Sequence, residues 1–430
     1  MSRLRVRARA GRLGVLRPLA IRDFALLWAG MSVSLLGDGI YFVAIAWQVY
    51  ELSNAPTALS VVGVAWTLPN VLLLLVGGVL SDRFDRRRLM IVSDVVRGLA
   101  IGTIAVLSLS GALELWHLLV LVAIYGAGEA LFIPAFQAIV PDIVPQEHLV
   151  QANSLDTLMR PLAVQLGGPA LGGLAIAGFG TGIAFALDAA TFAVSATCLA
   201  LMRSRPLPLK ENAIGIRSAL REVGEGFAFV RAHRWLWGTL AAAGLSLLLY
   251  YGPMEVLLPF VIKNELGGSS TDFGLALAAV GVGAIAAALV MGQRPMPRRP
   301  FTVMFTAWAI CMACVAVWGL ATELWQILAV SVVRGAGITV GTVLWTTIMH
   351  TRVPRHLLGR VSSFDWLMAM SLIPASFAIT GPVAEAAGAR ETLTAAGLLG
   401  ATLIFLLPFV LGVRRDERAA RPVDARPDSA

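Results

Sequence analysis

Apolar segments separated by short polar ones recur along almost the whole chain. Leu, Ala, Gly and Val dominate these segments without the alternation that is typical of strands. Each is long enough to cross a hydrocarbon core of about 30 Å as a helix, which satisfies its own backbone hydrogen bonds where water is absent. The pattern therefore predicts an all-α polytopic membrane protein with twelve transmembrane helices. We place them at 24–50, 58–80, 89–111, 116–139, 157–178, 182–202, 235–262, 271–292, 301–321, 325–349, 361–386 and 391–413.

The longest polar stretch, 203–234, lies in the middle of the chain and separates six predicted helices from six. We expect an N-terminal six-helix bundle at 24–202, a cytoplasmic linker at 203–234 and a C-terminal six-helix bundle at 235–413. Residues 1–23 are rich in arginine and are predicted to form a basic cytoplasmic arm. The charged, proline-containing segment 414–430 is predicted to be a disordered cytoplasmic tail.

The two halves are related in sequence. The segment YGAGEALFIPAFQAIVPDIVPQEHLVQANSLD, which begins at Tyr125, aligns without a gap to RGAGITVGTVLWTTIMHTRVPRHLLGRVSSFD, which begins at Arg334, 209 residues later. Identical positions include Gly126 and Gly335, Gly128 and Gly337, Pro145 and Pro354, and Asp156 and Asp365. Duplicated six-helix halves that face each other across a midplane cavity are the architecture of one large transporter class.

Basic residues are concentrated in the short polar segments, and this predicts the orientation of the chain. Loops on the cytoplasmic side of membrane proteins carry an excess of Lys and Arg. With both termini inside, Lys263 and Arg390 are the only basic residues in predicted outer loops. We therefore expect a multi-pass protein of the inner (plasma) membrane, embedded in the lipid bilayer, with both termini cytoplasmic.

Composition excludes several classes of protein. The chain is 57% hydrophobic and 14% charged, with mean hydropathy +0.78, whereas soluble domains carry about 25% charged residues. The net charge of +8 is spread over short loops, so no nucleic-acid partner is expected. Cys198, Cys311 and Cys314 lie inside predicted helices, so we expect neither disulfides nor a metal site. The chain has no GxxxxGK[ST], HExxH or GxSxG motif, so no enzyme activity and no cofactor are expected.

A polar motif follows the second predicted helix. The run Gly77-Gly-Val-Leu-Ser-Asp-Arg-Phe-Asp-Arg-Arg-Arg88 resembles the signature G-x-L-[SA]-D-R-x-G-R-[RK] between helices two and three of the major facilitator superfamily, with Asp85 where the family usually has Gly. The resemblance implies that Asp82 lies near the inner start of helix eleven and that the arginines pair with acids of helix four. The implied cytoplasmic gating residues are Gly78, Asp82, Arg83, Arg86, Arg87 and Asp142. The alternative is that these arginines only set the topology.

A second motif lies in the fifth predicted helix. Gly168, Pro169, Gly172 and Gly173 resemble the G-P-x-x-G-G motif of exporters in the same superfamily. Small residues let helix backbones approach closely, and Pro169 is expected to bend the helix. A helix-packing role and a role in the direction of transport both remain open.

Further segments indicate a subgroup of the superfamily. The sequences SLLGDGI, FIPAFQAIVPDIVP, QANSL and AFALDAATFAVSA resemble the transmembrane secretion effector branch, which includes enterobactin-type siderophore exporters and macrolide efflux proteins. The Arg that drug antiporters carry before the glycines of helix four is absent here. Arg334, at the repeat-related place in helix ten, is a candidate for the missing cation.

Ionisable residues inside predicted helices are the candidates for mechanism. A charge at the membrane centre costs at least ~2.5 kcal/mol, so each should face a partner or a water-filled cavity. We assign proton coupling or the substrate cavity to Asp38, Glu129, Arg97, Arg160, Glu255 and Arg334, with Asp38 and Glu129 first. A structural pairing of Glu129 with Arg97 or Arg160 is the alternative, and Asp188 is interpreted as structural.

The function predicted from these observations is secondary active transport. We expect a monomeric, proton-coupled exporter of small organic molecules, such as drugs, macrolides or siderophore-like compounds, which works by alternating access. Protons or another coupling ion would be partners. Aromatic candidates for lining an apolar cavity are Trp66, Trp308, Trp345, Trp366 and Phe132. Import of a small metabolite on the same fold and a membrane enzyme or non-transporting sensor remain alternatives.

Overall fold

The computed structural model describes residues 14–203, 224, 227–410 and 412. Most of the predicted arm, linker and tail therefore lies outside the described residues. The N-terminal half contains η1 (Gly14–Ala20), α2 (Arg22–Leu52), α3 (Pro56–Arg83), α4 (Arg86–Leu109), α5 (Leu115–Ile143), α6 (Leu149–Arg160), η3 (Pro161–Gly167), α7 (Gly168–Phe179) and α8 (Thr181–Leu201). The C-terminal half contains α10 (Arg234–Leu248), η4 (Pro253–Leu257), α11 (Leu258–Phe260), η5 (Val261–Glu265), α12 (Ser270–Gly292), α13 (Pro300–Leu320), α14 (Leu324–Arg352), α15 (Arg355–Ser371), α16 (Ile373–Ala387) and α17 (Ala389–Val410).

Twelve helical stretches in the described part of the chain are long and apolar enough to cross a membrane. Each overlaps one predicted helix, which confirms the predicted all-α, twelve-helix fold. Three stretches that we predicted as continuous helices are interrupted. Residues 161–167 and 253–257 form π-helical turns, and α15 gives way to α16 at Leu372. Prolines stand at or next to each break, and a residue without a backbone N–H cannot continue the regular hydrogen-bond ladder.

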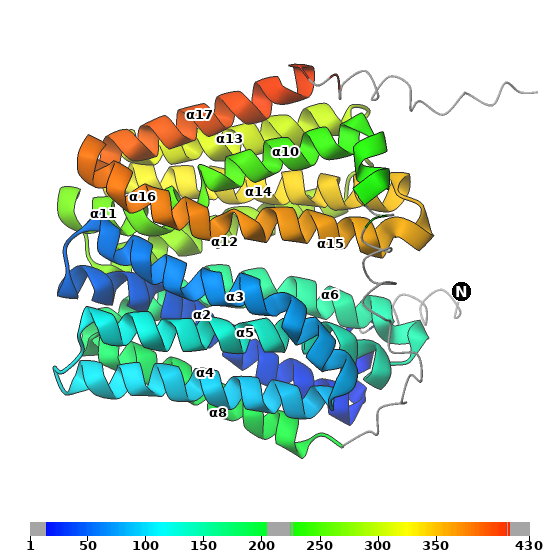
Figure 1. Cartoon of the computed structure of the whole chain (residues 1–430), viewed down its shortest axis with the longest axis horizontal. Helices are drawn as coiled ribbons and strands as arrows, with labels where there is room; N and C mark the ends of the chain where they lie inside the picture. The colour runs from blue at the N-terminus through cyan, green and yellow to red at the C-terminus, as the bar shows by residue number, and fades with distance from the viewer. Residues whose placement is uncertain (1–13, 204–223, 225–226, 411, 413–430) are drawn as a thin grey trace, which may run out of the picture.

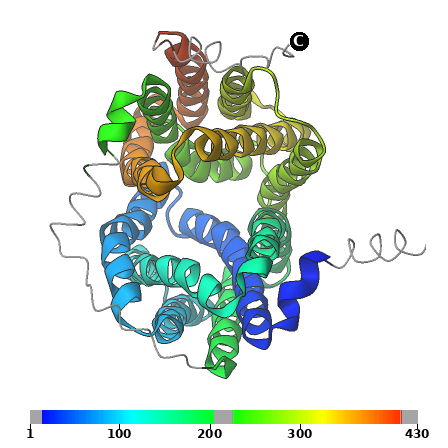
Figure 2. The ribbon, with the colours of Figure 1, turned by 90° about the vertical axis from the view of Figure 1, so that its right-hand side faces the viewer.

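The two halves form separate helix groups that lie side by side along their length (Figures 1 and 2). The same helix pairs pack in each: α3 against α5 and α12 against α14, then α4 against α8 and α13 against α17. The repeated glycines explain this match. Gly126 lies against the backbone carbonyl of Trp66, and Gly335 lies against that of Val280. The sequence repeat thus corresponds to two equivalent crossings of close-packed helices.

Gly335 provides a direct test of this packing. A Cβ at this position would overlap the Val280 carbonyl, which is backbone and cannot rotate away. We expect Gly335→Ala to lower the unfolding free energy by about 1–3 kcal/mol, the usual cost of overpacking. Gly102→Ala is the matched control, because its Cβ would meet only the Ala189 Cβ at 3.8 Å. Thermal unfolding in detergent would compare the two, and equal midpoints would contradict the proposed close crossing.

Contacts between the halves are concentrated at the end of the bundle that carries the connections at 53–55 and 388, which we call the far end. The Tyr50 hydroxyl donates to the Val256 carbonyl at 2.6 Å, and the Thr57 hydroxyl donates to Glu385. The Lys263 ammonium lies 5.1 Å from the centre of the Trp47 ring. The opposite end, where α2 begins and α8 ends, is called the near end. There α15 packs against α10, α14 and α16 of its own half.

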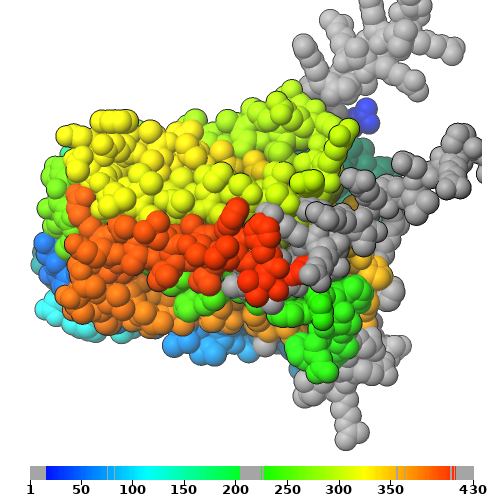
Figure 3. Space-filling view, turned by 90° about the horizontal axis from the view of Figure 1, so that it is seen from above, coloured from blue at the N-terminus to red at the C-terminus, as the bar shows by residue number. Residues whose placement is uncertain are grey.

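The outer surface of the helix groups is apolar, as lipid contact requires. Figure 3 shows the face on which α17 lies across the C-terminal half. Leu398 and Leu399 of this helix are 55% and 57% exposed. Trp366 is also 55% exposed, so the structure places it on the surface and not in an internal cavity.

Candidate functional site

Asp38 is the acid of α2 that lies inside the N-terminal half. The Tyr125 hydroxyl of α5 donates to Asp38 Oδ1 at 3.0 Å, and the Tyr125 ring stacks on that of Tyr41 with centroids 4.9 Å apart. Asp38 is partly exposed as a residue. Neighbouring Gly37 packs against Asp188 and Thr191 of α8. Two acids from different helices therefore lie close together at this level.

Arg97 is the cation of this region, and its direct partner is Asp94. Arg97 Nη2 and Asp94 Oδ1 are 2.5 Å apart, and both side chains are almost fully buried. The guanidinium also lies 4.6 Å from the ring centres of Phe132 and Phe192. Gly128 of α5 leaves room for the Arg97 side chain to pass. The pairing of Arg97 with Glu129, which the sequence left open, is replaced by this shorter pair within α4.

Glu129 is held by neutral donors. Trp66 Nε1 donates to Glu129 Oε2 at 2.9 Å, and Asn70 Nδ2 donates to the same oxygen at 2.7 Å. Trp66 also lines a small cavity between the halves, of about 40 Å³, to which Glu255 of η4 contributes. The structure thus brings Asp38, Arg97 and Glu129 into one polar cluster and places Glu255 across the interface.

Among the described residues, neither Arg160 nor Arg334 forms an ion pair with this cluster, although Asp38 lies within the electrostatic reach of Arg160. Arg160 Nε is 3.9 Å from Asp156 Oδ1, one turn earlier, so the alternative pairing with Glu129 does not form. Arg334 is buried, with its guanidinium 5.0 Å and 5.2 Å from the ring centres of Tyr250 and Trp318. Its Nη2 contacts the Met254 sulfur at 2.7 Å. Arg334, the buried cation of the C-terminal half, therefore lies between two aromatic rings.

The near-end motif makes contacts of two kinds. Arg86 forms an ion pair with Asp142 and donates to the Ala138 carbonyl at 3.1 Å. Arg87 donates to the Leu199 carbonyl at 2.6 Å and not to an acid, which corrects the expected pairing. The last carbonyls of α8 carry the negative end of its dipole and attract a cation. Asp85 caps α4, because its carboxylate accepts a hydrogen bond from the Arg88 amide at 3.1 Å. The aspartate that stands where the family usually has Gly therefore has a structural role.

The remaining motif residues add little to these contacts. Gly78 lies in α3 and has open space around it, and Arg83 is exposed. The side chain of Asp82 lies outside the described residues. The predicted contact between Asp82 and helix eleven therefore stays a prediction.

The glycine motif of α7 packs against both halves. Gly168 lies against the backbone of Gly39, and Gly172 against that of Ile40, both in α2. Gly173 lies against α12 of the other half, where the Ser270 and Thr271 hydroxyls donate to its carbonyl at 3.3 Å each. Pro169 follows the π-helical turn of η3, where the helix changes course. The motif therefore takes part in the far-end contact between the halves.

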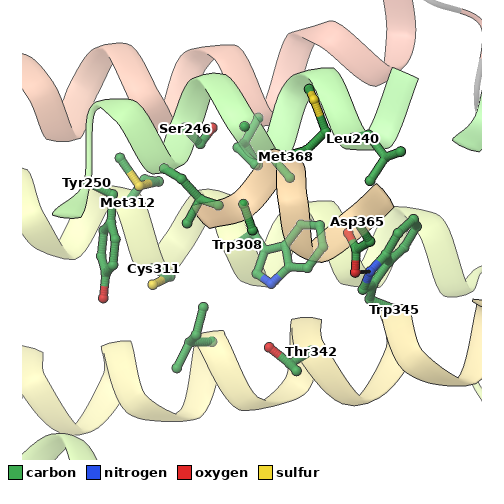
Figure 4. A pocket seen from close by; sticks show the side chains of 16 residues that line it. Leu240, Ser246, Tyr250, Trp308, Cys311, Met312, Thr342, Trp345, Asp365 and Met368 are labelled. Atoms are coloured by element: carbon green, nitrogen blue, oxygen red, sulfur yellow. Dashed lines mark hydrogen bonds between the residues drawn. The ribbon is translucent and has the colours of Figure 1, made fainter. Parts of the chain in front are cut away.

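A larger cavity lies within the C-terminal half, among α10, α13, α14 and α15 (Figure 4). It has a volume of about 190 Å³ and an apolar wall that includes Trp308, Met312 and Met368. Asp365 is its acidic residue, and Trp345 Nε1 donates to Asp365 Oδ2 at 3.1 Å. Trp308 reaches across α14 because Gly341 has no side chain to block it. Two of the five predicted aromatic residues therefore line this cavity.

Sequence reasoning missed three members of the N-terminal cluster. Asp94 stands three residues before Arg97, a spacing that places both side chains on one helix face and was available as a signal. Tyr125 and Asn70 carry no formal charge, so nothing in the apolar pattern marked them, whereas Trp66 was expected as a cavity residue and not as a donor to Glu129. Their roles depend on how α3 and α5 are rotated toward α2.

Comparison with known proteins agrees with the observed architecture. The profile of the family described as transmembrane secretion effector matches residues 13–426. The multidrug efflux pump Tap of Mycolicibacterium fortuitum is 30% identical over 90% of this chain and 95% of its own length. Macrolide efflux protein A of Streptococcus pyogenes is 20% identical over 91% of this chain and 96% of its own length.

Solved structures share the fold at low identity. A bacterial homologue of the iron transporter ferroportin in the inward-facing state has a TM-score of 0.68 at 15% identity, covering 93% of this chain and 99% of that one. The nucleoside transporter NupG has a TM-score of 0.65 at 9% identity, covering 91% and 99%. With twelve helices in two equivalent halves and a family match over nearly its whole length, the chain belongs to the transmembrane secretion effector family of major facilitator transporters.

Proposed function

We propose that this protein exports small organic molecules by exchanging them for protons. The observation that carries the proposal is the polar cluster of the N-terminal half, in which Asp38 and Glu129 are partly exposed acids within the membrane-spanning region. The similarity to multidrug and macrolide efflux pumps supports export as the direction. Drugs and macrolides of this kind are the proposed substrates.

The charges of the cluster favour proton binding. Asp38, Asp94, Glu129 and Asp188 are four acids that lie near the guanidinium of Arg97, and Arg160 adds a second, more distant positive charge near Asp38. Asp94 is neutralised by its ion pair with this guanidinium. An uncompensated charge in a region without water is costly, so the remaining acids are stable only with protons, cations or solvent beside them. Protons that bind and leave as the cluster faces one side and then the other would couple their movement to transport.

The far-end contacts support alternating access with both termini cytoplasmic. In this orientation the far end is the outer side, where α3 packs on α16 and α7 on α12. The bundles at 24–202 and 235–413 would be the units that rock, and residues 203–234 would join them. Release of the substrate outward requires the far-end contacts to separate while the halves approach each other at the near end.

Inside-out membrane vesicles test this function. Their lumen corresponds to the outside of the cell, so an acidic lumen should drive uptake of a labelled macrolide from the medium. One proton moving through 100 mV releases about 2.3 kcal/mol, enough for a gradient of roughly 50-fold of an uncharged substrate. A protonophore should abolish this uptake. Loss of macrolide from preloaded acidic vesicles, with no uptake, would indicate import and would contradict the proposal.

A further inference from the structure

The two halves each carry a cavity with one aspartate at the repeat-related position. Asp156 lines a cavity of the N-terminal half together with Phe136, and Asp365 lines the C-terminal cavity together with Trp345. Both pairs are separated by the 209 residues of the repeat. The two cavities are therefore equivalent places in the fold, and their differences show what each can bind.

The difference between them lies one helical turn after the aspartate. The sequence DTLMR ends at Arg160, and its counterpart DWLMA ends at Ala369. Arg160 lies 3.9 Å from Asp156 and provides its counter-charge. Ala369 lines the C-terminal cavity and brings no charge to Asp365. Within the described part of the chain, Asp365 forms a hydrogen bond with Trp345 and no ion pair.

The walls of the C-terminal cavity suit an aromatic cation. Trp308 and Trp345 lie with ring centres 6.4 Å apart, and Tyr250 adds a third aromatic ring. Figure 4 shows the Asp365 carboxylate next to the Trp345 indole at one end of the cavity. Aromatic faces attract cations, and an apolar wall with one carboxylate is the usual lining of a site that orients an apolar, charged ligand.

We propose that this cavity binds amphipathic organic cations. Asp365 would provide the negative charge that pairs with the bound cation, because Ala369 stands at the position where the N-terminal half has an arginine. This names a substrate class and a subsite for the exporter proposed above, and it rests on that function. Arg160 keeps the equivalent N-terminal cavity from binding the same class. Specificity for cations would thus come from the loss of one arginine in the second copy of the repeat.

Equilibrium binding to the purified full-length protein in detergent tests the proposal. The probes are tetraphenylphosphonium and tetraphenylborate, which have nearly the same shape and opposite charge. We expect saturable binding of the phosphonium at least about tenfold tighter than that of the borate, a difference of roughly 1.4 kcal/mol. Asp365→Asn should weaken phosphonium binding about tenfold or more and reduce the difference between the probes.

Two further variants separate charge from shape. Ala369→Arg reproduces the arginine of the N-terminal half and should abolish phosphonium binding. Asp156→Asn is the matched control, because it removes the equivalent, already neutralised carboxylate and should leave the affinity within about twofold. Because Asp365→Asn preserves size, it decides the question even if Ala369→Arg does not fold.

Phosphonium binding that is unchanged in Asp365→Asn, or equal to borate binding in the unmodified protein, would overturn the proposal. So would the absence of saturable phosphonium binding. None of these results depends on a proton gradient or on the direction of transport. The uptake of macrolide by vesicles therefore tests the proposed export function independently.

Discussion

Substitution of Glu129 by Gln, or of Asp38 by Asn, is expected to reduce the substrate gradient that a proton gradient can maintain from roughly 50-fold to about onefold. Both substitutions keep the size of the side chain and its capacity to accept hydrogen bonds from Trp66 or Tyr125. They remove only the ability to bind and release a proton. The measurement is accumulation of labelled macrolide in proteoliposomes with an imposed pH gradient.

Two comparisons make the result specific. Exchange of labelled for unlabelled substrate at equal pH needs no proton movement, so both variants should retain it. Glu147→Gln removes an exposed carboxylate near the end of the bundle and should accumulate substrate like the unmodified protein. If both variants kept full accumulation, Asp38 and Glu129 would lose their assigned role while the fold remained unchanged.

Loss of Arg97 is expected to have the largest effect on stability. Arg97→Met should lower the unfolding free energy by about 3–5 kcal/mol, because Asp94 would be left buried without its partner. The methionine side chain still fills the space between Phe132 and Phe192. Chemical unfolding in detergent, followed by tryptophan fluorescence, would measure the difference. Arg294→Met, at an exposed site, should change it by less than about 0.5 kcal/mol.

A double variant separates the charge effect from lost packing. Asp94→Asn in the Arg97→Met background removes the unpaired charge and should recover at least about half of the lost free energy. No recovery would mean that Arg97 acts mainly through its contacts with the two rings. It would also weaken the view that charge balance governs this cluster.

The fold was predictable because each transmembrane helix is encoded locally. Length and apolar composition locate the twelve helices, and the glycines at 126 and 335 reveal the repeat before any contact is known. The breaks in the seventh and eleventh helices were less predictable. Pro253, Pro259 and Pro374 were visible, but proline within a membrane helix can produce a kink, a π-helical turn or no break.

The candidate site was only partly predictable, because insertion cost marks a charged residue without naming its partner. Asp38 and Glu129 could be selected on this ground, and the structure places both in the polar cluster. The sequence offered Arg97 or Arg160 as alternative partners for Glu129, whereas its hydrogen-bond donors are Trp66 and Asn70. The rotation of each helix about its axis decides between these partners, and a pattern that is apolar on every face does not specify it.

The close approach of small residues at the far end affects the rate at which the two halves can separate there. Gly173 meets Gly274 across the halves, and Gly381 lies against Thr57 and Ser60. Further contacts across the halves at this end are the hydrogen bond from the Tyr50 hydroxyl to the Val256 carbonyl and the electrostatic attraction between Lys263 and Glu51. Opening this seam mainly exchanges weak dispersion contacts for water or lipid, so ionic strength should influence the rate of that step only through the few charged contacts, such as that between Lys263 and Glu51.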